Sequence, residues 1–575
     1  MRTECCILLS SLSPQASVLS PMSKYSLGLD FGTESGRALL VDVSDGREVA
    51  SAVLSYPDGV IDEKLPRTDI RLGPDWALQN PNDYSAVLRT AVPQVLKQAN
   101  ARAEDVIGIG VDFTACTVLP VTQDYTPLCN LPEWQNNPHA WVKLWKHHAA
   151  QPEADRINAL ARERNEWWLP YYGGKISSEW LLSKTLQILD EAPEVFHAAH
   201  KIVEAGDWIV YQMTGVETRN ACAAGYKGLY QGAYPPNDFL VALDARLNGF
   251  NETKISGNVL PPGVFAGALT EQAAQMMGLR AGTAVAVATI DAHAAVPGCG
   301  VTEGGRMVLI LGTSTCHMLM DAQKHLVPGI SGVVENGILP GLFGYEGGQA
   351  GVGDIFEWFV EHGVPREYHD KAEKRGTSVY ALLEEQAAQL RVGESGLLAL
   401  DWWNGNRSVL TDANLSGMLI GATLGTRAPD IFRALIEATA FGTQIIVETF
   451  EQNGVRVDEL VACGGLAARN KLMLQIYADV TGRAFKVAES AQTSALGAAL
   501  LGAAAAGSKN GGFDDINAAA KKMARLQDKV YTPNAENHAA YQKLFAEYKR
   551  LHDYFGRGEN DVMKRLREMK HAALA

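Results

Sequence analysis

Two short loops in this chain combine glycine with hydroxyl side chains directly after an apolar run. The first, LDFGTESGR at residues 29–37, places Asp30 at the end of such a run and follows it with Gly32 and Thr33. The N–H groups and hydroxyls of such a turn can hold phosphate oxygens, and the carboxylate can bind Mg²⁺ through water. The pattern predicts a phosphate loop, although it also fits an ordinary capped turn between two strands.

A second loop of the same composition stands in the other half of the chain. The string LGTSTC, residues 311–316, again follows an apolar run and places Gly312, Thr313 and Ser314 in a turn. One such turn is weak evidence, but two that face each other across a cleft can hold one chain of phosphates between them. We therefore interpret both as phosphate-binding loops.

The common nucleotide-binding motifs are absent. Gly174-Lys175 resembles the end of a P-loop, but Ile176 replaces the required Ser or Thr, and Leu169 stands where the first Gly belongs. No GxGxxG follows an expected strand. The sequence therefore does not indicate a P-loop NTPase or a Rossmann dehydrogenase.

The elements that position the first loop are strands joined by tight turns. Asp45-Gly46 lies between two apolar runs, which predicts a hairpin whose two central residues need positive φ. Asn80 and Pro81 stand where a helix cap and a first helical residue are expected. We expect a strand that ends at residue 30, strands over 38–43 and 106–113, and a helix over 81–99.

The second half repeats this strand–loop–strand theme. A strand over 459–463 ends in Gly464-Gly465. The pattern further predicts helices over 430–451, 468–480 and 494–506, and a helical tail over about 515–554. Alternating helices and strands indicate an α/β fold, here with two related domains that face one cleft and meet near residues 292–303.

These patterns divide the chain of 575 residues into four parts. We expect a disordered extension, a first domain, a second domain with its helical tail, and a frayed charged end, over 1–23, 24–295, 296–555 and 556–575. The extension is unlike a secretory signal because Ser and Pro interrupt its apolar stretch. No apolar run reaches the roughly 18–20 residues that a membrane helix needs.

The composition of the chain indicates which class of molecule it binds. The net charge of −14 and the lack of a dense Lys/Arg block argue against nucleic acid and favour small-molecule substrates. Hydrophobic residues make up 47% of the chain, which is ordinary for a globular protein. Eight cysteines are scattered without a CxxC pair, which favours free thiols in a reducing cytoplasm over a zinc site or a disulfide framework.

Taken together, the two loops and the turn ACGGLAARN at 462–470 resemble the actin–hexokinase–Hsp70 ATPase superfamily. The stretch 417–437 resembles the C-terminal signature of the FGGY carbohydrate kinase family, from which it departs at Ala422 and Leu435. Strings throughout 24–550, among them GVDFTACTVLPV, YGGKISSEWLLSK, YEGGQAGVGDIFEWF and DWWNGNR, resemble the L-ribulokinases of that family. The resemblance implies two RNase H-like domains around a central cleft.

The activity implied by the resemblance is the ATP-dependent phosphorylation of L-ribulose to L-ribulose 5-phosphate in L-arabinose catabolism. Asp291, in VATIDAHAAVPG, matches the catalytic base of the family. It follows an apolar run over 283–290, so its carboxylate would emerge at a strand end and accept a proton from a sugar hydroxyl. Its alternative role is to cap the Ala-rich segment that follows.

The resemblance also implies a set of sugar contacts. Trp145, Lys227 and Glu346 match sugar-contacting positions of ribulokinases, as does the backbone around Ala115, and Asp291 belongs to the same set. An ammonium and a carboxylate can bracket a polyol, and a Trp can stack on its C–H face. Taken singly, these residues also fit a surface Lys, a core Trp and a solvated Glu.

Gly464, Gly465, Asn470 and the turn at 494–497 resemble the adenosine-binding region of the family. Glycines let the backbone approach a flat base closely, although tight helix–strand packing needs them as well. The implied cofactors are ATP and Mg²⁺, with Asp30 as a water-mediated metal ligand.

Two other readings of the sequence stay open. The first is a neighbouring FGGY kinase that acts on D-ribulose, xylulose, ribitol or glycerol. The second is a nucleotide-gated binding protein of the same superfamily without sugar transfer, against which Asp291 and the Trp, Lys and Glu set argue. The sequence leaves the preference among ketopentoses undecided, and a homodimer is possible.

Overall fold

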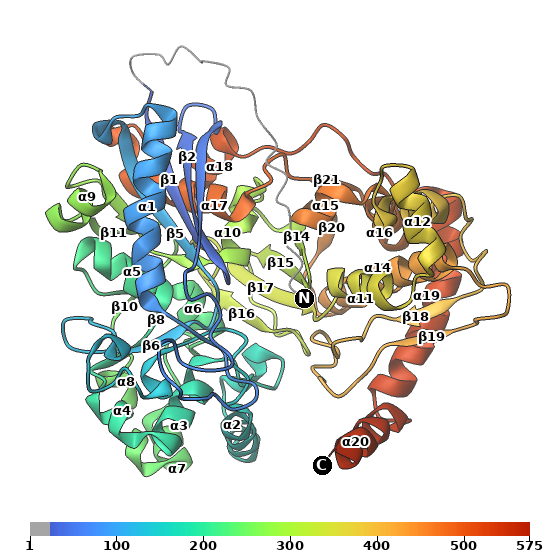
Figure 1. Cartoon of the computed structure of the whole chain (residues 1–575), viewed down its shortest axis with the longest axis horizontal. Helices are drawn as coiled ribbons and strands as arrows, with labels where there is room; N and C mark the ends of the chain where they lie inside the picture. Colours follow the sequence, from blue (N-terminus) through green and yellow to red (C-terminus); the bar gives the residue numbers. More distant parts are fainter. Residues whose placement is uncertain (1–22, 575) are drawn as a thin grey trace.

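The computed structural model describes residues 23–574 and shows two lobes side by side (Figure 1). The disordered extension expected over 1–23 therefore lies outside the described residues, apart from Ser23. No helix within the described range is long and apolar enough to cross a membrane.

The sheet of the N-terminal lobe carries the first loop. β1 pairs antiparallel with β2 and parallel with β5, so that the loop after β1 and the end of β5 lie at the same sheet edge. The order is β11-β12-β5-β1-β2-β3, and β13 also pairs with β5. The bounds are β1 Tyr25–Phe31, β2 Ser35–Asp42, β3 Glu48–Ser55, β5 Val106–Phe113, β11 Phe265–Ala268, β12 Ala284–Ala286 and β13 Thr289–Ile290.

The sheet of the C-terminal lobe repeats these connections. β14 pairs antiparallel with β15 and parallel with β20, as β1 does with β2 and β5. The order is β16-β17-β15-β14-β20-β21. The bounds are β14 Gly305–Leu311, β15 Thr315–Asp321, β16 Gly332–Glu335, β17 Phe343–Gln349, β20 Val457–Cys463 and β21 Phe485–Val487. The run β17-β15-β14-β20-β21 thus matches β3-β2-β1-β5-β12, and the prediction of two related α/β domains is confirmed.

Helix α1 (Pro81–Ala99) begins and ends where the sequence predicts. The side chain of Asn80 accepts a hydrogen bond from the backbone N–H of Asn82, and Pro81 occupies the first turn, where no intrahelical donor is needed. The helix ends at Asn100, which adopts a left-handed conformation at φ 50°. Its apolar face packs against the first sheet.

Two helices between the lobes interlock them. α10 (Asp291–Gly298) follows strand β13 of the N-terminal sheet but contacts β14 and β15 of the C-terminal sheet. Conversely, α17 (Thr493–Ala506) follows the C-terminal sheet but packs on β1 and β5, as the orange helix beside the blue strands shows (Figure 1). Glycines permit the approach, since a Cβ on Gly110 would lie 1.8 Å from the carbonyl oxygen of Ala498.

Further elements extend each lobe. The N-terminal lobe adds a four-stranded sheet of order β4-β7-β6-β8 and the pair β10-β9. The lobe also contains helices α2 to α9. The bounds of these strands and helices are β4 Leu78–Gln79, β6 Val118–Val121, β7 Val142–Lys143, β8 Lys201–Glu204, β9 Thr218–Asn220, β10 Asn258–Leu260, α2 Gln151–Glu163, α3 Leu181–Glu191, α4 Pro193–Ala198, α5 Ala205–Thr214, α6 Ala221–Tyr226, α7 Asn237–Leu243, α8 Phe250–Thr253 and α9 Glu271–Met277.

The C-terminal lobe adds one strand pair and most of the late helices. Their bounds are β18 Leu398–Leu400, β19 Met418–Ile420, α11 Gly353–His362, α12 Arg366–Lys374, α13 Val379–Ala387, α14 Ala428–Gln452, α15 Gly465–Arg469, α16 Lys471–Thr481, α18 Ile516–Met523, α19 Ala535–Gly556 and α20 Val562–Leu574. The long tail helix α19 packs on α14, α16 and β18, and its Tyr548 donates to the carboxylate of Asp401, just after β18, at 2.6 Å.

Three local expectations differ from the structure. The turn after β2 has positive φ at Gly46 only, because the loop is longer than a two-residue hairpin and β2 carries a bulge. The helix expected over 468–480 is two helices, α15 and α16, because Asn470 is extended and its side chain caps α16. The last twenty residues, expected to be frayed, contain α20, whose Met563 is buried.

Candidate active site

Three carboxylates gather where neighbouring parallel strands end. Asp30 on β1 and Asp112 on β5 are direct partners in the strand register, so their side chains lie on one face of the sheet. Asp291 is the first residue of α10, immediately after β13, which pairs with the end of β5. The sequence predicted Asp30 and Asp291 as site residues, and the fold brings them together with Asp112.

Asp291 has the proton affinity of a base that works near neutral pH. Burial raises its pKa to about 7, the charges of Asp30 and Glu346 act in the same direction, and Lys227 opposes them. One of its oxygens accepts a hydrogen bond from the backbone N–H of Ala292 at 2.6 Å, which fixes the carboxylate and leaves the other oxygen available. A carboxyl group poised in this way can accept a proton from a bound hydroxyl.

The other two carboxylates offer oxygen ligands. Asp30 forms an ion pair with Arg37 at 3.2 Å, yet burial still raises its pKa. Asp112 is fully buried, and neither of its oxygens has a hydrogen-bond partner within residues 23–574. No cluster of three His, Cys, Asp or Glu side chains suited to a metal occurs in that range. This donor set fits a Mg²⁺ ion that keeps most of its waters and arrives with the phosphates.

The two predicted phosphate loops are closed by similar backbone hydrogen bonds, although the first loop is one residue longer. Gly32 donates its N–H to Ser35 at 3.0 Å in the first loop, and Gly312 donates to Ser314 at 3.0 Å in the second. The second loop is braced by the start of α11, since Val352 donates to the carbonyl of Thr313 at 2.8 Å. The loops occupy equivalent positions after β1 and β14, as expected for a duplicated phosphate site.

Trp145, one of the predicted sugar contacts, is bonded to the first loop. Its indole N–H donates to the hydroxyl of Thr33 at 3.0 Å, and Gln79 donates to the carbonyl of Thr33 at 2.6 Å. Trp145 is half-buried, so part of the residue remains accessible. The structure therefore places Trp145 beside the first phosphate loop.

Lys227 and Glu346 pair with each other across the two lobes. The ammonium of Lys227, just after α6, donates to both carboxylate oxygens of Glu346 on β17, at 2.9 and 2.8 Å. Burial disfavours the charged form of each residue, but the attraction between the two charges is stronger than this effect. The pKa of Lys227 is therefore raised and that of Glu346 is lowered. Burial lowers the pKa of neighbouring His293 to about 3, so this imidazole is neutral.

The backbone around Ala115 is held in place by two buried ionisable side chains. Cys116 adopts a left-handed conformation at φ 55°, and the ammonium of Lys184 donates to its carbonyl. The carboxylate of Glu204 accepts the N–H of Thr117 at 3.1 Å. These bonds fix the carbonyl and N–H directions of the loop that carries Ala115.

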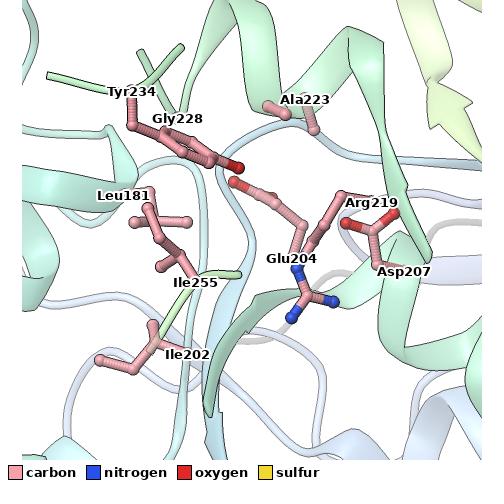
Figure 2. A pocket seen from close by; sticks show the side chains of 10 residues that line it. Leu181, Ile202, Glu204, Asp207, Arg219, Ala223, Gly228, Tyr234 and Ile255 are labelled. Carbon is pink, nitrogen blue, oxygen red and sulfur yellow. The ribbon is translucent and has the colours of Figure 1, made fainter. Parts of the chain in front are cut away.

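A small cavity lies behind this loop. Figure 2 shows Glu204 pointing toward the hydroxyl of Tyr234, with Arg219 beside Asp207. Burial raises the pKa of Glu204 to about 8. The cavity measures about 10 Å³, close to the space that one water molecule requires. The cavity is therefore too small for a sugar.

The expected adenosine region lies at the end of β20. Gly464 has φ 92°, and a Cβ there would lie 2.5 Å from the carbonyl oxygen of Leu311, so glycine is required. Gly465 faces open space, with no atom within 4 Å of a built Cβ. Asn470 is buried and caps α16 by accepting the N–H of Met473 at 2.9 Å. Gly465 is thus the open position of the three, while the side chain of Asn470 already has a structural partner.

Comparison with known proteins agrees with this geometry. The models of the N- and C-terminal domains of the FGGY family of carbohydrate kinases match residues 25–298 and 307–506. The ribulokinase of Geobacillus thermodenitrificans is 56% identical over 96% of this chain and 98% of its own length. The ribulokinase of Halalkalibacterium halodurans is 57% identical over 95% of this chain and 98% of its own.

A solved structure shows the same fold. The xylulose kinase from Lactobacillus acidophilus matches with a TM-score of 0.76 at 18% identity, covering 93% of this chain and 99% of that one. The duplicated sheets and this likeness define a two-lobed protein with the RNase H-like fold, and the two family models make it a carbohydrate kinase. Within that class, the chain belongs to the FGGY family of carbohydrate kinases, which confirms the family, fold class and kinase activity predicted from the sequence.

Proposed function

We propose that this kinase transfers the terminal phosphoryl group of ATP to L-ribulose and forms L-ribulose 5-phosphate. The observation that carries the proposal is identity of 56–57% to two ribulokinases over nearly the whole length of each chain. The reaction would serve L-arabinose catabolism in the cytoplasm. The chain could act as a homodimer, which a sedimentation experiment would decide.

Asp291 is the proposed general base. With its pKa near neutrality, it holds the proton-accepting oxygen toward the cleft and takes the proton of the attacking sugar hydroxyl as transfer proceeds. Mg²⁺, when bound with ATP, neutralises charge on the phosphates. Asp30 would hold it through water, and the unpartnered carboxylate of Asp112 is a second candidate ligand through water.

The sugar would lie between Trp145, the backbone at Ala115 and the Lys227–Glu346 pair. The pair supplies both donors and acceptors, as a polyol requires. The phosphates would lie between Gly32-Thr33 and Gly312–Ser314, and the base near Gly464 and Gly465. In this proposal the first lobe, 24–295, contributes most of the sugar site and the second, 296–555, most of the nucleotide site, while Glu346 crosses from the second lobe to the sugar.

A substrate panel tests the proposal. In a coupled ADP assay, kcat/KM for L-ribulose should exceed the values for D-ribulose, D-xylulose, L-xylulose, ribitol and glycerol. A higher value for another member of the panel would replace L-ribulose as the substrate within the same family. ADP release that does not depend on any sugar would instead support a nucleotide-gated binding protein.

The sugar contacts can be tested separately. Trp145→Ala and Glu346→Gln should raise KM for the sugar more than KM for ATP, because they remove contacts to the sugar. Since Trp145 is also bonded to Thr33, Trp145→Phe separates the two roles: it keeps the ring and loses the hydrogen bond. Equal increases in both KM values would assign these residues to the nucleotide side.

A further inference from the structure

Arg407, the last residue of the DWWNGNR string, lies over β17 and is not among the predicted site residues. The next residue anchors it: Ser408 donates its N–H to the carbonyl of Gly348 at 3.1 Å, and its hydroxyl accepts the N–H of Gly348 at 3.1 Å. A Cβ built on Gly348 would lie 3.4 Å from Cδ and 3.5 Å from Nη1 of Arg407. The arginine side chain therefore lies against the face of β17 at Gly348, where no side chain of the strand stands in its way.

That space faces the cleft. Residues two apart on a strand point to the same side, so Gly348 faces the side on which Glu346 meets Lys227. Across the sheet, Gly348 is the register partner of Cys316 on β15, two residues after Ser314 of the second phosphate loop. Arg407 thus stands between the Lys227–Glu346 pair and the phosphate loop, where the sugar and the phosphates must meet.

The positive charge of Arg407 is left unpaired by the residues that the structure describes. Within residues 23–574 its guanidinium has no hydrogen-bond or ion-pair partner. Glu346 lies close enough for the charge of Arg407 to help lower its pKa, but both of its carboxylate oxygens already accept hydrogen bonds from Lys227. A guanidinium that is largely removed from water and lacks a carboxylate is costly unless a ligand supplies an anion.

We propose that Arg407 is a catalytic residue whose guanidinium binds the phosphoryl group during its transfer from ATP to the sugar. This inference rests on the proposed kinase function and extends it. In the step, the sugar hydroxyl gives its proton to Asp291 and its oxygen forms a bond to the γ-phosphorus. The bond from that phosphorus to the bridging oxygen breaks, and ADP leaves with the electron pair. The planar guanidinium of Arg407 can donate two parallel hydrogen bonds to the oxygens of the transferred phosphoryl group. Its positive charge would stabilise the negative charge on those oxygens.

Kinetics of Arg407→Met and Arg407→Lys test this role. Removing one stabilising donor should lower kcat roughly 100-fold or more, while KM for L-ribulose and for Mg-ATP changes only a few-fold. Lysine should restore little, because it cannot offer the same two-pronged contact. Arg391→Met is the matched control, since Arg391 is exposed and pairs with Glu394 on the surface, and it should leave kcat unchanged.

Chemical rescue separates a catalytic from a structural role. Millimolar guanidinium chloride should restore part of the kcat of Arg407→Ala but none of that of Asp291→Asn. A kcat of Arg407→Lys and Arg407→Met within threefold of wild type, or a loss confined to the KM of the sugar, would overturn the proposal. If Arg407→Met does not fold, Arg407→Lys at full kcat is decisive against it. Wild-type protein that phosphorylates no ketopentose would refute the proposed function instead, which keeps the two failures distinct.

Discussion

Burial raises the pKa of Asp30, Asp112 and Asp291, and the different partners of these carboxyl groups distinguish them from one another. Asp291 has a pKa of about 7 and a bond to a single N–H, whereas Asp30 is paired with Arg37. Asp291→Asn keeps the shape and removes the proton acceptor, so kcat should fall about 100-fold or more, roughly 3 kcal/mol of barrier. Calorimetry should show the affinities for sugar and Mg-ATP changed only a few-fold. A kcat within tenfold of wild type would transfer the role to Asp30 or Asp112.

The raised pKa of Asp291 also links activity and stability to pH. The proposed base works only when it is unprotonated, so kcat/KM should rise with pH through about 7. Stability runs the other way: the folded state holds the proton more tightly than the unfolded state, so this group costs stability as pH rises from about 4 toward 7. Asp291→Asn should therefore raise the melting temperature more at pH 8 than at pH 5.5. An equal change at both values would mean that Asp291 is ionised at both.

At the scale of elements, the α10–α17 crossing fixes where Asp291 points. A Cβ on Gly497 would lie 1.8 Å from the carbonyl oxygen of Ala294 in α10. Gly→Ala inside a helix normally stabilises it by about 0.8–1 kcal/mol, but Gly497→Ala should lower the melting temperature and kcat together, because the helices must separate. Gly425→Ala, at a glycine whose built Cβ has its nearest neighbour 3.7 Å away, should leave both unchanged. A more stable Gly497→Ala protein would show that α10 and α17 can move apart at little cost in folding free energy.

The elements also show which features a sequence can predict. Asn80-Pro81 marks the start of α1, and a carboxylate after an apolar run marks Asp30 and Asp291, because these signals are local. Lys227 and Glu346 form an ion pair although they lie 119 positions apart in the chain. Arg407 reaches the cleft only through the register of β17 on β15. Such contacts depend on strand order, which no local pattern encodes. The break at Asn470 was local but was missed, because the apolar period continues through it.

At the scale of the whole molecule, the lobes meet at the crossing helices and at the Lys227–Glu346 pair, which lies where sugar is expected. Closure of two lobes around substrate excludes water and limits wasteful hydrolysis. L-ribulose with a non-hydrolysable ATP analogue should therefore reduce the radius of gyration measured by solution scattering. Lys227→Met should weaken this response, because it removes the ion pair that bridges the lobes, whereas Lys521→Met, at an exposed lysine of α18, should respond as wild type does. Superimposable wild-type curves with and without ligands would mean that the cleft is already closed, and water would then have to be excluded by the ligands themselves.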